Sequence, residues 1–185
     1  MKSMKLVPSD VLNFWFSERV KPLWFNSTPE FDAEIHTQFL AVYYAALNVK
    51  IDAWKESAEG CLALVIILDQ FPLNMFRGLE ESFHGESKAI EIAKYAINQG
   101  FDAELAGEQK AFLYMPLMHS ETLVDQDISV SLFEKAGLKD NLRFAKHHRE
   151  IVRRFGRFPH RNRILNRRST EAELEYLASD EAFHG

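Results

Sequence analysis

The sequence contains little cysteine, glycine or proline, and it has no long hydrophobic run. Its single cysteine, Cys61, excludes a disulfide within the chain, and its place in an apolar stretch predicts a buried, inert thiol. Only eight glycines and six prolines occur in 185 residues, so we expect no long flexible linker. The longest apolar run, residues 61–68, has eight residues, which is too short to span a bilayer.

The usual signatures of secretion, catalysis and metal binding are also missing. Residues 1–10 lack the apolar stretch of a secretory peptide, so we expect a cytoplasmic protein with no membrane partner. The sequence has no HExxH, CxxC or GxSxG motif and no glycine-rich phosphate loop. Its seven histidines are scattered, so no metal site is predicted, and the cofactor, if there is one, stays unknown.

What the sequence does contain is helical periodicity, in a chain that is 46% hydrophobic and has 15 phenylalanines. Thr28 can cap a helix that starts at Pro29, and apolar residues then recur every three or four positions as far as Ala46. Similar patterns predict helices that begin near residue 8 and that cover residues 60–70, 87–99, 103–114, 122–136, 138–155 and 170–178. We therefore predict an all-α fold, a single domain over residues 1–185 with an array of about six to eight helices.

Two prolines predict where helices end. The segment 60–71 is apolar on every side, and its helical neighbours favour a buried helix over a buried strand. Pro72 disfavours helical dihedral angles at Phe71, so this helix is expected to stop near Gln70. Pro116 similarly predicts that the segment 115–121 is irregular. A buried aromatic core is expected to include the side chains of Trp15, Phe39, Phe144 and Phe155.

Charge is distributed unevenly along this acidic chain. Residues 139–168 hold eleven Lys or Arg and two acids, whereas the rest holds 11 basic and 25 acidic residues. A concentrated basic segment in an acidic protein suggests a local anion site. It could equally be a basic face paired with the acidic remainder. The sequence pI of 5.8 argues against nucleic acid as a partner.

The predicted helix 138–155 carries a histidine on its apolar face. A helical wheel places His148 among Phe144, Ile151 and Phe155, and it places Arg154 at the edge of that face. A buried imidazole needs a hydrogen-bond partner, and a satisfied core histidine is the ordinary explanation. The alternative is that His148 belongs to a functional site with the residues that follow.

Those residues, RFPHRNR, form a loop rich in hydrogen-bond donors. Arg157 and Arg161 offer forked guanidinium groups that suit carboxylates or phosphates, and His160 can titrate near neutral pH. Clustered guanidinium groups normally need a carboxylate or a bound anion beside them. Asp69 and Glu121 are the candidate internal partners, and a sulfate or phosphate is the external one.

Two further segments combine polar residues with helix interruptions. Asp69 at the end of an apolar helix opposes the helix dipole, so it should have a cationic partner. His119 and Glu121 could orient a water or a metal ion, or could form a local hydrogen-bonded corner. Because Asp69, His119 and His148 all lie in or beside apolar elements, we expect their side chains to cluster in space.

The segments LVIILDQFPLNMFRG, FLYMPLMHSE and HREIVRRFGRFPHRNRIL, followed by RRST, resemble the bacterial family called domain of unknown function 924. The resemblance covers residues 11–177 and implies a TPR-like helical fold without an established activity. It implies site roles for Asp69, Gln70, Asn74, Arg77, His119, Ser120, Glu121, His148, Arg154, Arg157, His160, Arg161 and Asn162. The family usually has Arg at Leu73 and Gly at Asn166, which weakens anion binding by the DQFP segment and puts the turn before the last helix in doubt.

These observations lead to two hypotheses of different class. In the first, a small anionic molecule binds, with or without catalysis, in a polar pocket formed by the DQFP, HSE and RFGRFPHRN segments. Asp69, His119, Glu121, His148 and His160 would then be the acid, base or catalytic groups, and the ligand would be held by Gln70, Asn74, Arg77, Arg154, Arg157, Arg161 and Asn162. In the second, the chain is a TPR-like module for a protein or peptide partner, and its polar motifs are structural.

Overall fold

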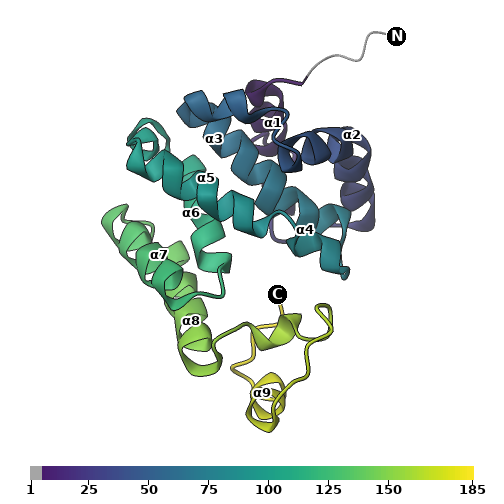
Figure 1. Cartoon of the computed structure of the whole chain (residues 1–185), viewed down its shortest axis with the longest axis vertical. Coiled ribbons are helices and arrows are strands. Elements are labelled where there is room, and N and C mark those ends of the chain that lie inside the picture. Colours follow the sequence, from purple (N-terminus) through teal and green to yellow (C-terminus); the bar gives the residue numbers. More distant parts are fainter. Residues whose placement is uncertain (1–5) are drawn as a thin grey trace. The chain divides into compact units, whose positions relative to one another are not determined.

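The computed structural model describes residues 6–185, and every regular element in this range is a helix, as predicted (Figure 1). The helices are α1 Pro8–Trp15, α2 Pro29–Leu47, α3 Ala58–Val65, α4 Phe71–Met75, α5 Glu86–Asn98, α6 Gly107–His119, α7 Leu123–Lys135, α8 Lys139–Phe155 and α9 Glu171–Leu177. A π-helical segment, η3 Ile66–Gln70, joins α3 to α4 into one helix, Ala58–Met75. Counted in this way, the described chain has eight helices.

The helices belong to two compact units. The first comprises the described residues as far as Arg77 together with Glu81–Pro116, and the second comprises Gly78–Glu80 and Leu117–Gly185. The predicted single domain stays a prediction, and each unit is described by itself.

Local sequence signals place the ends of several helices. The Thr28 side chain accepts a hydrogen bond from the backbone N–H of Phe31, at the start of α2. Thr170 and Glu173 form the expected capping box of α9. Gly156 ends α8 with φ of 71°, a left-handed conformation that costs glycine little.

The core of the first unit is an aromatic cluster. Trp15 and Phe39 are 1% and 2% exposed, as predicted, and Trp15 contacts the rings of Phe71 and Phe112 at centroid distances of 5.6 Å each. Phe39 lies 4.5 Å from Phe71. The central helix α3 packs against α1 and α5 (Figure 1). The edge-to-face contacts of the Trp15 ring with Phe71 and Phe112 add to the free energy that Trp15 gains from burial alone.

The prediction that the central helix stops near Gln70 is wrong. Phe71 has helical dihedral angles, and its N–H donates to the carbonyl of Ile66, five residues earlier. This wider π turn lets the helix continue through Pro72, which has no N–H and would otherwise crowd the carbonyl of Leu68. Gly85 approaches that carbonyl closely, since a Cβ at this position would stand 2.2 Å from the Leu68 oxygen.

The prediction of an irregular segment around Pro116 is also wrong, because α6 continues to His119. Leu113, Met115 and Leu117 are at most 3% exposed, so burial favours the helix over the break that proline alone would cause. The helix Ala58–Met75 is 18 residues long and apolar enough to cross a membrane, which the eight-residue run did not reveal. However, 83% of it is buried inside the protein, as in the core helix of a soluble protein.

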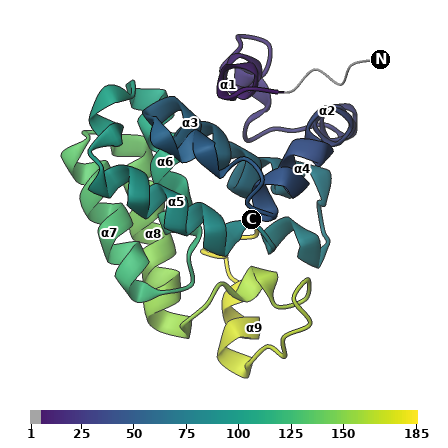
Figure 2. The same cartoon turned by 45° about the horizontal axis from the view of Figure 1, so that its top comes forward.

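In the second unit, α7 and α8 lie side by side (Figures 1 and 2). The buried residues Ile151, Val152, Phe158 and Tyr176 form its apolar cluster at the end of α8. Phe155 is partly buried against this cluster. Phe144 was predicted to be core but is 46% exposed, with the guanidinium group of Arg143 over its ring.

Candidate functional site

The arginine-rich loop of the second unit is held by two carboxylates. Arg157 donates to both oxygens of Glu173, from Nε at 2.6 Å and from Nη2 at 2.8 Å, and Nη2 also donates to the carbonyl of Arg168. Arg167 makes the same kind of two-pronged contact with Glu121, at 2.6 and 2.8 Å. Such forked pairs are strong and geometrically specific.

Asn162 connects the two pairs. Its Oδ1 accepts a hydrogen bond from Nε of Arg167 at 3.0 Å, and its Nδ2 lies 3.3 Å from Oε2 of Glu173. Glu121 additionally accepts from the backbone N–H of Phe158. We call this network the clasp, formed by Glu121, Arg157, Asn162, Arg167 and Glu173. It fixes the segment from the end of α8 to the start of α9.

The clasp shifts the acidities of its carboxyl groups. The hydrogen bonds from Arg157 are the main cause that lowers the pKa of Glu173 to about 2. Burial works to raise the pKa of Glu121, but the contacts from Arg167 and Phe158 outweigh it, so this pKa lies below its ordinary value. Both groups are therefore charged at neutral pH. Asp69 and Glu121 were expected as partners of the loop arginines. Arg157 pairs with Glu173 instead, and Glu121 pairs with Arg167, which lies outside that loop.

Arg161 lies beside the clasp and is almost completely buried, with 6% exposure. Its Nη2 donates to the carbonyl of His119 at 2.9 Å, and its guanidinium group lies 4.8 Å from the centre of the Phe158 ring. These contacts are internal ones. The predicted role of Arg161 in binding a ligand stays a prediction.

The histidines of the second unit gather around the same loop. His148 is 4% exposed, and its Nδ1 donates to the carbonyl of Phe144 at 2.8 Å, because a carbonyl can only accept. Burial is the main cause that lowers the pKa of His148 to about 4 and that of His160 to about 3. Both imidazoles are consequently neutral at pH 7. His148 thus fits the satisfied core histidine of the sequence analysis, and its proposed catalytic role stays a prediction.

The HSE segment forms a local hydrogen-bonded corner. Ser120 Oγ donates to Asp125 at 2.7 Å and accepts from the backbone N–H of Thr122. Gln126 donates to the carbonyls of Met118 and Ser120 at 2.7 Å each. The corner is made by Ser120, Asp125 and Gln126, and the Glu121 side chain pairs with Arg167 instead, so the roles expected for His119 and Glu121 stay predictions. Within residues 6–185, no group of three or more His, Cys, Asp and Glu side chains could hold a metal ion.

The DQFP segment lies in the first unit, where its polar residues also have internal partners. Asn74 and Arg77 both donate to Asp32 in α2, with Asn74 Nδ2 at 2.7 Å and Arg77 Nε at 2.7 Å. Gln70 Nε2 donates to the carboxylate of its neighbour Asp69 at 2.6 Å, and both residues are 5% exposed. The expected proximity of Asp69 to His119 and His148 joins residues of different units and stays a prediction.

Comparison with known proteins follows the same segments. The family model for a bacterial protein of unknown function (DUF924) matches residues 11–181. A solved structure of a protein of unknown function from Agrobacterium tumefaciens is 38% identical in sequence, covers 92% of this chain and 96% of its own, and superposes with a TM-score of 0.87. No functionally curated protein matches.

The chain belongs to the DUF924 family. The turn that Asn166 put in doubt is formed, because Asn166 takes a left-handed φ of 51°, which asparagine tolerates better than most residues. Leu73, at the other departure from the family's usual residues, is partly exposed in α4.

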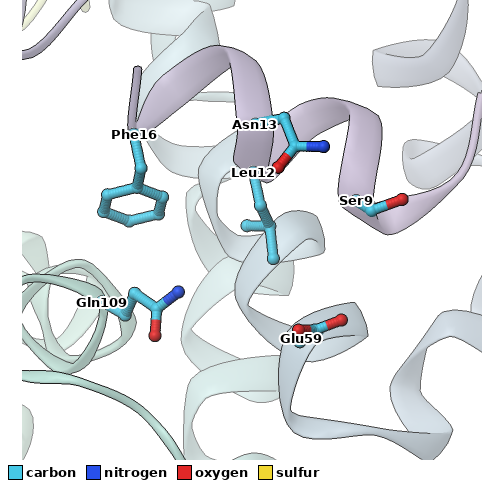
Figure 3. Close-up of a pocket in the computed structure, with 6 residues that line it drawn as sticks. All are labelled: Ser9, Leu12, Asn13, Phe16, Glu59 and Gln109. Carbon is cyan, nitrogen blue, oxygen red and sulfur yellow. The ribbon is translucent and has the colours of Figure 1, made fainter. Parts of the chain in front are cut away.

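Each unit of this DUF924 chain has a pocket among the described residues. The pocket of the first unit has a volume of about 210 Å³ (Figure 3). It contains none of the predicted site residues, and is lined by Ser9, Leu12, Asn13, Phe16, Glu59 and Gln109. Its polar side chains come from exposed or partly exposed positions on α1, α3 and α6, so no motif in the sequence points to it.

The pocket of the second unit is larger, with a volume of about 480 Å³, and it includes two of the predicted ligand-binding residues, Arg154 and Arg157. Phe155, Thr170, Ala172 and Glu173 complete its lining. We call it the Arg154 pocket. Sequence reasoning assigned Glu173 only to a helix cap and gave Arg167 no role. The forked pairs of both residues join positions 16 and 46 residues apart, which no local pattern could predict.

Proposed function

We propose that the second unit binds a small molecule with a carboxylate or phosphate group in the Arg154 pocket. Its volume of about 480 Å³ falls within the range of about 300–1,000 Å³ that is usual for small-molecule sites. The volume exceeds the needs of an inorganic anion, and the Phe155 ring and Ala172 offer apolar surface. The ligand is therefore expected to combine an anionic group with an apolar or aromatic part.

The observation that carries this proposal is the state of Arg154. Its guanidinium carbon lies 4.8 Å from the centre of the Phe155 ring and 5.9 Å from that of Tyr176, which positions the charge at the pocket. Among residues 6–185, no carboxylate forms an ion pair with Arg154, whereas the other two charged lining residues, Arg157 and Glu173, neutralise each other. The pocket thus retains one positive charge for an anion.

Thermal melts with phenyl phosphate and with inorganic phosphate test the proposal, against potassium chloride at equal ionic strength. A ligand that binds only the folded state raises the melting temperature, and at about 100 times its Kd it adds about 3 kcal/mol of stability. We expect phenyl phosphate to raise the melting temperature of the wild type and to lose this effect in Arg154→Ala. Arg153→Ala is the matched control, because Arg153 is adjacent but pairs with Glu150 outside the pocket. An effect that survives Arg154→Ala contradicts the proposal.

The alternative is a TPR-like module for a protein or peptide partner. The clasp favours it, because Arg157 and Asn162 are engaged with Glu173, and Glu121 with Arg167, rather than directed at a ligand. Under this alternative no small anion shifts the melt of the wild type. Both readings keep the expectation of a cytoplasmic protein.

A further inference from the structure

An aromatic residue beyond α9 is seated among the histidines of the second unit. The ring centre of Phe183 lies 4.5 Å from that of His148 and 5.0 Å from that of His160, with interplanar angles of 62° and 84°. The ring of Phe158 contacts both imidazoles, with its centre 5.4 Å from that of His148 and 5.6 Å from that of His160. The Phe183 ring is thus held by edge contacts from the imidazoles of His148 and His160, and by a longer one from His147, whose ring centre is 6.4 Å away.

The same site also binds the backbone of Phe183. The N–H of Phe183 donates to the hydroxyl oxygen of Tyr176 at 2.9 Å, and Tyr176 itself is 5% exposed. We call His148, Phe158, His160 and the Tyr176 hydroxyl the aromatic seat. It contacts two features that occur together in an aromatic residue of a peptide, namely a benzene-sized ring and the N–H next to it.

The seat is built from three buried residues and the partly buried His160, whereas its occupant belongs to an exposed segment. Phe158 is fully buried, and Nδ1 of His160 is a buried nitrogen without a hydrogen-bond partner among the described residues. By contrast, residues 179–181, 184 and 185 are exposed, and Ala182 and Phe183 are partly buried. In the part of the chain that the structure describes, no ion pair fixes residues 179–185. Phe183 is therefore the anchor of this segment.

The imidazoles suit an uncharged aromatic occupant. Burial lowers the pKa of both His148 and His160 well below 6.5, so both are neutral at pH 7. The nearby charged groups are Arg161, whose guanidinium group lies against the Phe158 ring, and Glu121, whose carboxylate pairs with Arg167. A neutral ring can therefore enter the seat without leaving a charge unpaired.

We propose that the aromatic seat is a binding site for an aromatic residue of a peptide, and that Phe183 is its intramolecular occupant. An occupant tethered to the same chain competes at a high effective concentration, so it lowers the apparent affinity for any external ligand. The proposal does not depend on the Arg154 pocket, because the two sites would take ligands of different chemistry. Tyr176 lies near both, with its ring beside Arg154 and its hydroxyl in the seat, but no lining residue of the pocket belongs to the seat.

The test compares the full-length wild type with Phe183→Ala, using N-acetyl-phenylalaninamide as the probe and the ring signals of His148 and His160 in NMR spectra as the readout. We expect Phe183→Ala to bind the probe about tenfold more tightly or better, because the tethered competitor is gone. N-acetyl-leucinamide is the control and should bind much more weakly. Equal affinities for wild type and variant, or equal affinities for the two probes, overturn the proposal.

A second variant separates a recognition site from a mere cavity. Tyr176→Phe, made in the Phe183→Ala background, removes the hydroxyl acceptor and keeps the ring. Tyr176→Phe should lower the affinity for N-acetyl-phenylalaninamide about tenfold, which is the order expected for one lost hydrogen bond. It should leave the affinity for toluene unchanged, because toluene has no N–H to donate. If Tyr176→Phe changes the affinities for the two ligands equally, the site is only an apolar cavity, and the proposal is wrong. If Phe183→Ala fails to fold, Phe183 is a core residue, and the proposal is wrong.

Discussion

The guanidinium group of Arg167 donates two hydrogen bonds, of 2.6 and 2.8 Å, to the carboxylate of Glu121, which precedes it by 46 positions. The side chains are 22% and 24% exposed, so the pair is shielded from water over most of its surface. Unlike a surface ion pair, it also carries backbone contacts, since Glu121 accepts from Phe158 N–H and Arg167 donates to the Phe158 carbonyl. The pair therefore anchors the RFGRFPHRN loop.

Arg167→Ala should destabilise the protein by about 1–3 kcal/mol, because it leaves a partly buried carboxylate without its cation. Denaturation with urea measures the free energy of unfolding. Arg163→Ala is the control, because Arg163 lies four residues earlier, is exposed, and should change stability by less than about 0.5 kcal/mol. Equal effects of the two substitutions would show that the clasp contributes nothing to folding.

Stability should depend on pH through Glu173. Its pKa falls from 4.5 to about 2 on folding, so the stabilising contribution is fully present above pH 4.5 and is lost as the pH falls towards 2. The loss amounts to about 2–3 kcal/mol. Glu173→Gln should flatten the pH dependence in this window, and Glu171→Gln, an exposed neighbour in the same turn, should not. Unfolding free energies between pH 2 and 5 that are parallel for wild type and Glu173→Gln would contradict this.

Two phenylalanines, one in each unit, should differ sharply in their cost of truncation. Phe39 is 2% exposed and contacts Phe71, so Phe39→Ala should cost about 3–5 kcal/mol. Phe144 is 46% exposed, and Phe144→Ala should cost less than about 1 kcal/mol. The partly buried Phe155 should fall between them. Denaturation with urea of the three variants gives the order of the free energies of unfolding. A loss of several kcal/mol for Phe144→Ala would show that the Phe144 side chain is buried, which contradicts the structure.

Gly85→Ala should destabilise the first unit. Alanine would normally stabilise a glycine site with ordinary dihedral angles by about 0.4–1 kcal/mol, and Gly85 has φ of −85°. Here the new methyl group would stand 2.2 Å from the Leu68 carbonyl oxygen. The backbone must therefore shift beside the π-helical segment, and we expect a loss of more than about 1 kcal/mol. A thermal melt unchanged or raised by Gly85→Ala would refute the close contact.

Much of the fold could be predicted from local sequence signals. Thr28 with Pro29, and Thr170 with Glu173, start helices because their caps satisfy backbone N–H groups within three residues. The helix ends expected at the two prolines were wrong. Pro72 and Pro116 lie inside helices because the neighbouring apolar residues gain more by burial than the broken helix geometry costs, and a π turn relieves the strain at Pro72.

The candidate site could be predicted only in outline. The basic loop was found from its composition, but the partners of Arg157 and Arg167 are distant in the sequence. Phe144 shows the limit of the helical wheel, because the wheel gives the face of a residue and not how much of that face is covered: Ala145 in the same turn is fully buried, while Phe144 is 46% exposed. The apolar cluster with Phe158 and Tyr176 covers the later turns of α8, where Ile151 and Val152 lie. The exposed fraction of the Phe144 side chain thus depends on tertiary packing, which the periodicity of the sequence does not reveal.

The most direct measurement compares Arg154→Ala with Arg157→Ala in melts with and without phenyl phosphate. Arg157 belongs to the clasp, so Arg157→Ala should lower the melting temperature in buffer alone. Arg154 has no carboxylate partner among the described residues, so Arg154→Ala should melt as the wild type does in buffer but should not respond to phenyl phosphate. If the wild type itself does not respond, or if Arg154→Ala responds as the wild type does, the Arg154 pocket is not an anion site.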